Sequence, residues 1–311
     1  MSFGNELKKE LCRGRLSTVE ELSARTLGML LFARAFGPEA MVLQTENRAV
    51  AGLYADSIFA LIGLSATISV TERRRRGGET VYTAAVDSAE DRVKILRFFG
   101  WLADGTQGLS ALPQRFDKEE ERAAFLAGAY LACGSVIDPS KSYHLEFSVR
   151  EEGLCRALEQ ILAEAYQPPK VFLRRGSYVA YYKESGAVED LITLMGGAKF
   201  SLEIMNVKVY KSIRNRVNRT QNCEMANLEK TAMASAAQCE DIEFLLSQRG
   251  PEFLPEDLRE LALLRAENPD MSLRELGESL SQPLTRSGVN HRLKRLSALA
   301  RELREKVLET D

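Results

Sequence analysis

Hydrophobic and polar positions along residues 20–200 follow the same order twice, at an offset of one hundred residues. Apolar helical stretches at 26–36 and 126–136 precede strand-like runs at 40–47 and 143–149, respectively. Both halves continue with an amphipathic helix, two β-rich runs around a glycine turn, and a further helix. The pattern therefore predicts an α+β domain made of αββαββα-like material twice over.

Small residues line up between the two copies. Gly28 falls on Gly128 at this offset, and Ala132 and Gly134 share a stripe with Gly128. Because these residues put almost nothing on that stripe, a second helix can approach backbone to backbone. Arg34 stands where the second copy has Gly134, which argues against equally close packing at that end of the first helix. The alternative is an ordinary apolar core helix that contains a glycine.

Two helices packed in this way, each bearing its own sheet, resemble the LAGLIDADG homing endonuclease fold. In that family the penultimate acid of the motif holds the metal ions that activate water and stabilise the leaving oxygen during phosphodiester cleavage. The corresponding positions are Ala33 and Cys133. A methyl group and a thiol do not serve Mg²⁺, which takes oxygen ligands. The resemblance thus implies the fold without the cleavage activity, and no catalytic residue, metal or other cofactor is expected.

The last third of the chain predicts three helices. Ser272 and Glu275 have the spacing of a capping box, and the short helix they begin carries Leu273, Leu276 and Leu280 on one face. The segment "SQPL" ends it, and a new helix begins near Thr285 or Ser287. Five residues of this helix are expected to point inward: Val289, Leu293, Leu296, Leu299 and Leu303. The preceding stretch "EDLRELALLRAENP" supplies the third helix.

The opposite face of the final helix is polar and basic. A short turn followed by such a helix matches the helix-turn-helix arrangement, whose second helix enters the major groove of DNA. Arginine pairs with guanine and asparagine with adenine, so Arg286 and Asn290 are the candidates for base reading. The other candidates for DNA contact on this helix are Ser287, His291, Arg292, Lys294 and Arg295, of which the last three suit phosphates. The alternative is a plain helical hairpin.

Composition supports a folded protein of two or three domains, with 311 residues, 45% of them hydrophobic and 28% charged. The net charge is only −2, but charge is sorted along the chain. Residues 208–219 include five basic residues and no acidic one, and residues 286–304 include six basic residues and one acidic residue. Arg214, Arg216 and Arg219 in the first block are candidates for phosphate contact, with a solvated linker helix as the alternative.

Other residue types exclude several classes. The five cysteines form no CxxC pair, and two histidines are too few for a histidine-based metal centre or a Ser-His-Asp hydrolase. No apolar run is long enough for a membrane span, and the start lacks the apolar stretch of a signal peptide. A cytoplasmic, nucleoid-associated protein is expected.

Arginine runs beside the two glycine turns have two interpretations. They comprise Arg73, Arg74, Arg75 and Arg76 in the first copy, and Arg174 and Arg175 in the second. They either contact phosphates from a relic DNA-binding saddle or are solvated hairpin tips. The second interpretation is favoured, because acids are as frequent as bases in this half.

Longer segments identify a more specific resemblance. The combination of "IRNRVNRTQNCEMANLEKT" (213–231), "SLRELGES" (272–279) and "SGVNHRLKRL" (287–296) is similar to the WhiA family of bacterial regulators associated with sporulation and cell division. The similarity includes the start "SFGNELKKEL". It implies a sequence-specific transcription regulator built from an inactive endonuclease scaffold and a helix-turn-helix domain. The implied partners are double-stranded DNA at promoters and either the transcription machinery or another regulator, with no membrane.

Domain boundaries and rival functions complete the expectations. A scaffold is expected over 1–200, with repeats at about 20–105 and 120–200, then a helical linker with the basic segment over 201–250 and the DNA-binding domain over 251–311. An active metal-dependent nuclease would need paired carboxylates, for which Glu46 and Glu146 are the candidates. A nucleoid, chromosome-segregation or RNA-binding protein without promoter choice is the other alternative.

Overall fold

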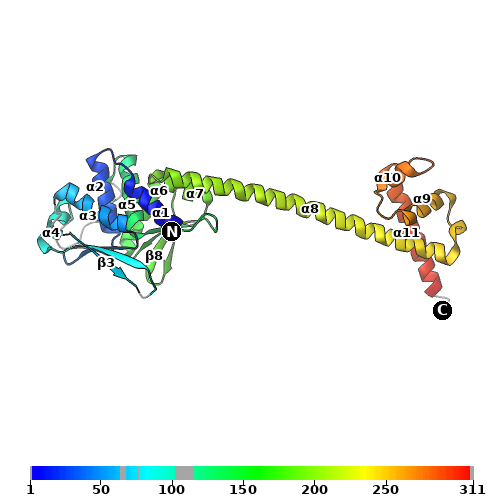
Figure 1. Ribbon diagram of the computed structural model, residues 1–311, viewed down its shortest axis with the longest axis horizontal. Coiled ribbons are helices and arrows are strands. Elements are labelled where there is room, and N and C mark those ends of the chain that lie inside the picture. Colours follow the sequence, from blue (N-terminus) through cyan, green and yellow to red (C-terminus); the bar gives the residue numbers. More distant parts are fainter. Residues whose placement is uncertain (1, 64–67, 76, 102–111, 113–114, 309–311) are drawn as a thin grey trace. The chain divides into compact units, whose positions relative to one another are not determined.

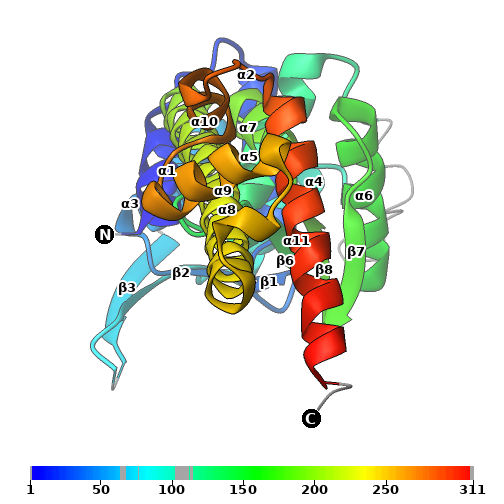
Figure 2. The same cartoon turned by 90° about the vertical axis from the view of Figure 1, so that its right-hand side faces the viewer.

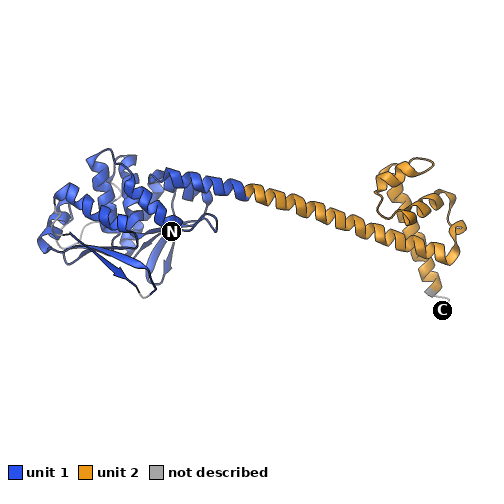
Figure 3. Ribbon diagram, viewed as in Figure 1, with its two compact units in different colours: residues 1–211 blue, residues 212–311 orange. Residues whose placement is uncertain are grey.

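The computed structural model describes residues 2–63, 68–75, 77–101, 112 and 115–308. The chain divides into two compact units, residues 1–211 and 212–311 (Figure 3). Compactness does not measure which segments fold independently, so the domain boundaries predicted at residues 200 and 250 stay a prediction.

The first unit begins with helix α1 (Phe3–Arg13). Two series of elements in the same order follow it (Figure 1). The helices of the repeated motif are α2 (Val19–Leu31) and α5 (Glu119–Cys133), which pack against each other. Strands β1 (Ala35–Phe36), β2 (Met41–Thr45), β3 (Ile68–Arg74) and β4 (Thr80–Val86) follow α2. Strands β5 (Gly134–Val136), β6 (Leu145–Val149), β7 (Lys170–Arg174) and β8 (Ser177–Tyr182) follow α5.

The topology of the two sheets confirms the duplication. Both are antiparallel, with the orders β1-β2-β4-β3 and β5-β6-β8-β7. The helices of the first copy are α3 (Arg48–Ile62) and α4 (Ala89–Phe98), and those of the second are α6 (Glu152–Ala165) and α7 (Ser185–Leu194). One hydrophobic core includes Tyr54, Phe125, Tyr130 and Phe147, all almost fully buried.

Close approach of α2 and α5 at the paired glycines confirms part of the small-residue prediction. A Cβ on Gly28 would lie 2.3 Å from the Phe125 carbonyl oxygen, and one on Gly128 would lie 2.0 Å from the Arg25 carbonyl oxygen. Gly134 is not part of this stripe, because α5 ends at Cys133 and Gly134 begins β5. Arg34 likewise lies beyond α2, is exposed, and donates to Gln44 Oε1 at 2.7 Å, so it does not disturb the helix contact.

Helix α8 (Ala198–Arg249) is continuous through the basic segment. It begins at Ala198, directly after Gly196 and Gly197, three residues before the linker boundary predicted at residue 201. The helical character expected for the linker is confirmed.

The second unit closes with a short 3-10 helix η3 (Pro251–Phe253) and the helices α9 (Glu256–Glu267), α10 (Leu273–Ser279) and α11 (Arg286–Leu308) (Figure 2). Its core is separate from that of the first unit. Of the five side chains predicted to point inward from α11, four are buried, Leu299 is partly buried, and Ala300 is also buried. The helical pattern of the last third therefore gave the correct buried face.

Candidate nucleic-acid interface

The capping box fixes where α10 begins. Ser272 Oγ accepts from the Glu275 backbone N–H at 3.3 Å, and Glu275 Oε2 accepts from the Ser272 N–H at 2.7 Å. These bonds use backbone donors that the first helical turn leaves without partners. The Ser272 backbone N–H also holds the pKa of the Glu275 carboxyl below its ordinary value.

The turn between α10 and α11 depends on close contact at Gly277. A Cβ there would lie 2.3 Å from the Leu284 carbonyl oxygen and 3.1 Å from a methyl group of Val289. The Leu284 N–H donates to the Gly277 carbonyl oxygen at 3.0 Å, and Thr285 Oγ1 then accepts from the Gly288 N–H at 3.2 Å. The turn is thereby closed, and α11 begins at Arg286.

The first turns of α11 present polar groups to solvent. Arg286, Ser287, His291 and Lys294 are exposed and Asn290 is half-buried. Within the described part of the chain, none of their side chains has a hydrogen-bond or ion-pair partner. The N-terminus of a helix disfavours a cation, and α11 has no acid in its first turn to offset Arg286. A phosphate or a base edge would supply the missing acceptors.

Two other predicted contacts have partners inside the protein. Arg292 donates to the Asp257 carbonyl oxygen at 2.8 Å, and Arg295 forms an ion pair with Asp257 Oδ2 at 2.6 Å. Both therefore tie α11 to the first turn of α9. Phosphate contact by these two arginines stays a prediction, because an exposed guanidinium has further donors.

Sequence reasoning missed the residues that position α11. Glu260 accepts from the Ser281 N–H at 2.6 Å and from its hydroxyl at 2.7 Å, and these bonds hold the pKa of the Glu260 carboxyl below its ordinary value. Asp241 on α8 pairs with Arg304 at 2.6 Å. The sequence offers one signal for these pairs: residues 240–260 are mainly acidic, but this does not identify the basic residues that each acid contacts.

The basic block on α8 separates into engaged and exposed residues. Lys211 donates to the Pro139 carbonyl oxygen at 2.7 Å, and Lys208 lies 4.0 Å from Glu189. Three arginines remain exposed, namely Arg214, Arg216 and Arg219. At 3.6 residues per turn, Arg216 and Arg219 lie about 60° apart around the helix, and Arg214 lies about 160° from Arg216. The three therefore do not share one face.

The motif positions in the first unit do not fit the metal of the endonuclease fold. Ala33 and Cys133 line one cavity of about 490 Å³, and the charged residues in its described lining are Arg34, Arg150 and Glu151. Burial raises the pKa of the Cys133 thiol to about 12, so the thiol is neutral at physiological pH. No cluster of three or more acidic, histidine or cysteine side chains suited to a metal occurs among the described residues.

The two glutamates matched across the repeat are not equivalent. Strand β2 starts at Met41 and β6 at Leu145, so the offset between copies is no longer one hundred at the strands. Glu46 is exposed just after β2, whereas Glu146 lies within β6 and pairs with Arg174 at 2.7 Å. Burial opposes ionisation, but bonds with Arg174 and His144 outweigh it and lower the pKa of the Glu146 carboxyl. The two glutamates that the rival nuclease interpretation would need therefore do not occupy equivalent positions.

The described arginines of the two hairpins are all exposed, and of these Arg174 alone forms an ion pair. Arg73, Arg74 and Arg75 are exposed, while Arg76 lies outside the described residues. Arg174 is engaged by Glu146, and Arg175 occupies the turn with a φ of 50°.

Two family models match this chain. One, described as the WhiA LAGLIDADG-like domain, matches residues 122–214, and the other, described as the WhiA C-terminal HTH domain, matches residues 217–300. Fold and matches together define the class, a LAGLIDADG-like domain joined to a helix-turn-helix domain. Among the described residues, no helix is long and apolar enough to cross a membrane.

Relatives extend over nearly the whole chain. The "Probable cell division protein WhiA" of Clostridium botulinum is 35% identical over 317 residues, which cover 98% of this chain and 99% of that protein. The protein of the same name from Ruminiclostridium cellulolyticum is 35% identical over the same shares of the two chains. The crystal structure of full-length DUF199/WhiA from Thermatoga maritima has the same fold, with a TM-score of 0.57, 24% identity, and coverage of 97% of this chain and 99% of that chain. The chain belongs to the WhiA family.

Proposed function

We propose that this protein is a sequence-specific DNA-binding regulator of transcription, acting on bacterial genes for cell division or sporulation. The observation that carries the proposal is the start of α11, where Arg286, Ser287 and Asn290 have no partner among the described residues. The relatives named as cell division proteins support this choice of genes.

In this proposal the side chains divide between reading and positioning. Arg286 and Asn290 bond base edges in the major groove, while Ser287, His291 and Lys294 contact the DNA backbone. Arg292 and Arg295 orient α11 through Asp257 and direct their remaining donors to phosphates. The scaffold acts without cleavage, because Ala33 and Cys133 replace the metal-binding acids. Promoter DNA, with the transcription machinery or another regulator, is the expected partner.

Selection from a random duplex pool tests the proposal. Full-length wild-type protein is expected to enrich one DNA motif, and Asn290→Ala to lose discrimination at one base pair by about 1–3 kcal/mol. Arg301→Ala, an exposed change farther along α11, is the matched control and should keep the motif. Chromatin occupancy of the tagged protein should then show sharp promoter peaks that Asn290→Ala removes.

Three results would contradict the proposal. Equal affinity for unrelated duplexes, with salt dependence alone, would indicate a nucleoid protein without promoter choice. Enrichment of the same motif by Asn290→Ala would mean that α11 is not the reading helix. Cleavage of duplex DNA by purified protein with Mg²⁺ would restore the nuclease interpretation.

A further inference from the structure

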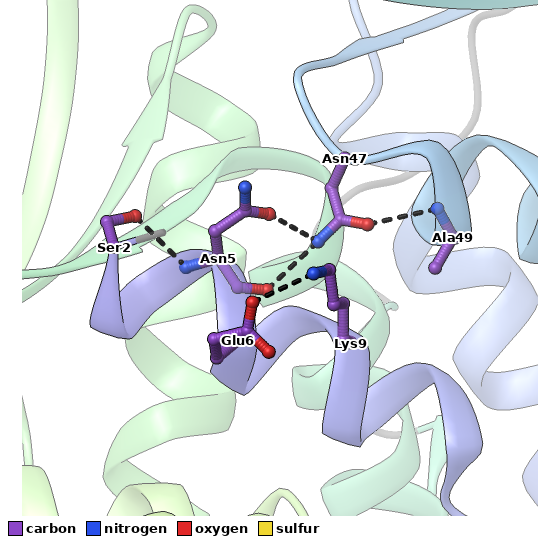
Figure 4. A network of polar contacts seen from close by, with 6 residues as sticks. All are labelled: Ser2, Asn5, Glu6, Lys9, Asn47 and Ala49. Carbon is purple, nitrogen blue, oxygen red and sulfur yellow. Dashed lines mark hydrogen bonds and ion pairs between the residues drawn. The ribbon is translucent and has the colours of Figure 1, made fainter.

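Helix α1 is fastened to the first repeat by a polar network (Figure 4). Asn47 Nδ2 donates to the Asn5 carbonyl oxygen at 3.0 Å and to Asn5 Oδ1 at 2.5 Å, while Asn47 Oδ1 accepts from the Ala49 N–H at 3.0 Å. Ser2 caps the start of α1, and Leu7 is fully buried beneath it. These contacts hold the backbone of α1 in place at the next residue, Lys8.

The ammonium of Lys8 reaches the end of the second motif helix. Its Nζ donates to the Leu131 carbonyl oxygen at 3.1 Å and lies 5.6 Å from the centre of the Tyr130 ring. Carbonyl groups in the last turn of a helix lack partners within the helix and carry partial negative charge. Within the described part of the chain, no carboxylate forms an ion pair with Lys8.

The position of this charge matters because Leu131 precedes Cys133 by two residues in α5. Burial lowers the pKa of the Lys8 ammonium, and the neighbouring groups Cys133, Cys12 and Glu46 act in the opposite direction. The side chain thus lies beside the position where the endonuclease motif has its metal-binding acid. The side-chain nitrogen at the end of α5 thus comes from α1.

We propose that Lys8 is the resident cation of this site: it takes the place of a metal ion beside residue 133 and keeps divalent cations out. A fixed ammonium attracts the carbonyl end of α5 and repels a second cation, and both effects are stronger in a poorly hydrated site than in water. Restoring the two motif acids would then give an ion pair with Lys8 rather than a metal site.

Manganese binding by full-length variants tests this inference, with Mn²⁺ alone as the probe. Ala33→Asp/Cys133→Asp is expected to show no binding by calorimetry or by the Mn²⁺ paramagnetic resonance signal. Adding Lys8→Met should make Mn²⁺ binding at least tenfold tighter. Arg13→Gln, which removes an exposed charge from the same helix, is the matched control and should produce no such gain. Equal Mn²⁺ affinity with and without Lys8 would overturn the proposal, as would no binding by the folded triple variant.

A thermodynamic cycle gives a second readout that does not require metal. A carboxylate introduced by Cys133→Asp has a partner when Lys8 is present and lacks one after Lys8→Met. The unfolding equilibrium constant should therefore rise at least tenfold more from Cys133→Asp in the Lys8→Met background than in the wild type. Additive effects of the two substitutions would show that the ammonium does not act at residue 133.

Discussion

Asp257 uses both its backbone and its side chain to hold the helix proposed to read DNA. Its carbonyl oxygen accepts from Arg292 and its carboxylate pairs with Arg295. The two arginines lie three residues apart on α11 and so project on the same side. At the residue scale, a basic side chain on the recognition helix can therefore orient the helix as well as attract DNA.

Arg295→Ala is expected to weaken binding to all duplexes about equally and to lower the salt dependence. Its cost to the free energy of unfolding should be only about 0–1 kcal/mol, since both partners of the ion pair are roughly half exposed. Asp257→Asn separates the two roles, because it frees the guanidinium without removing it. Filter binding over a salt series and thermal unfolding measure the effects. Equal loss of DNA affinity in both variants would mean that Arg295 acts only through Asp257.

Backbone-to-backbone contacts define two pairs of elements. Helices α2 and α5 meet at Gly28 and Gly128, and α10 meets the following turn at Gly277. In each case the atom facing the missing Cβ is a carbonyl oxygen, which cannot rotate away as a flexible side chain can. At the element scale, both domains therefore depend on glycines that admit no larger residue.

Gly128→Ala should destabilise the protein by about 1–3 kcal/mol or more, because its Cβ would fall 2.0 Å from the Arg25 carbonyl oxygen. Gly52→Ala within α3 is the matched control, since nothing lies within 4 Å of a Cβ there. It should stabilise the helix by about 0.5–1 kcal/mol. Urea unfolding measures both changes. A Gly128→Ala protein as stable as wild type would show that the two helices separate easily.

Gly277→Ala is predicted to remove specific DNA binding while leaving the first unit folded. The added Cβ would displace Leu284 and with it the start of α11. Gly288→Ala lies in the first turn of α11 and makes only ordinary contacts, the nearest at 3.6 Å, so it should keep the thermal unfolding profile. Binding to the selected duplex, with circular dichroism as the measure of folding, compares the two variants. Full binding by Gly277→Ala would mean that this turn does not fix α11.

The distribution of charge matters more than its total for the whole molecule. A net charge of −2 gives no general attraction to DNA, so contact must come from local groups. Exposed basic side chains occur at the start of α11, and at Arg216 and Arg219 on one side of α8. We expect basic residues in both places to contact phosphates.

Substituting Arg216→Gln and Arg219→Gln together should lower the slope of log affinity against log salt by about 1.8, or about 0.9 for each lost phosphate contact. The preferred DNA motif should not change, because phosphates carry no base information. Arg214→Gln, on another side of the helix, is the control. A slope unchanged by the double substitution would identify this part of α8 as a solvated linker.

Periodicity predicted most elements correctly, including both copies of the repeat, the capping box at Ser272 and the buried face of α11. One boundary was wrong at a glycine: Gly134 was placed on the small-residue stripe of the helix, but it begins a strand. The match between Glu46 and Glu146 assumed that the offset of one hundred residues continues beyond the motif helices. It does not continue, because β6 starts later in its copy than β2 does.

The sequence by itself determined the duplicated α+β domain, the helix-turn-helix and the absence of motif acids at Ala33 and Cys133, since each is a matter of residue type and local spacing. Only the tertiary structure decided which charges meet. Lys8 reaches α5 across 123 positions of the chain, and Arg295 reaches Asp257 across 38. Such pairs follow from how helices pack, and a spacing pattern contains no information about a partner so distant in the chain.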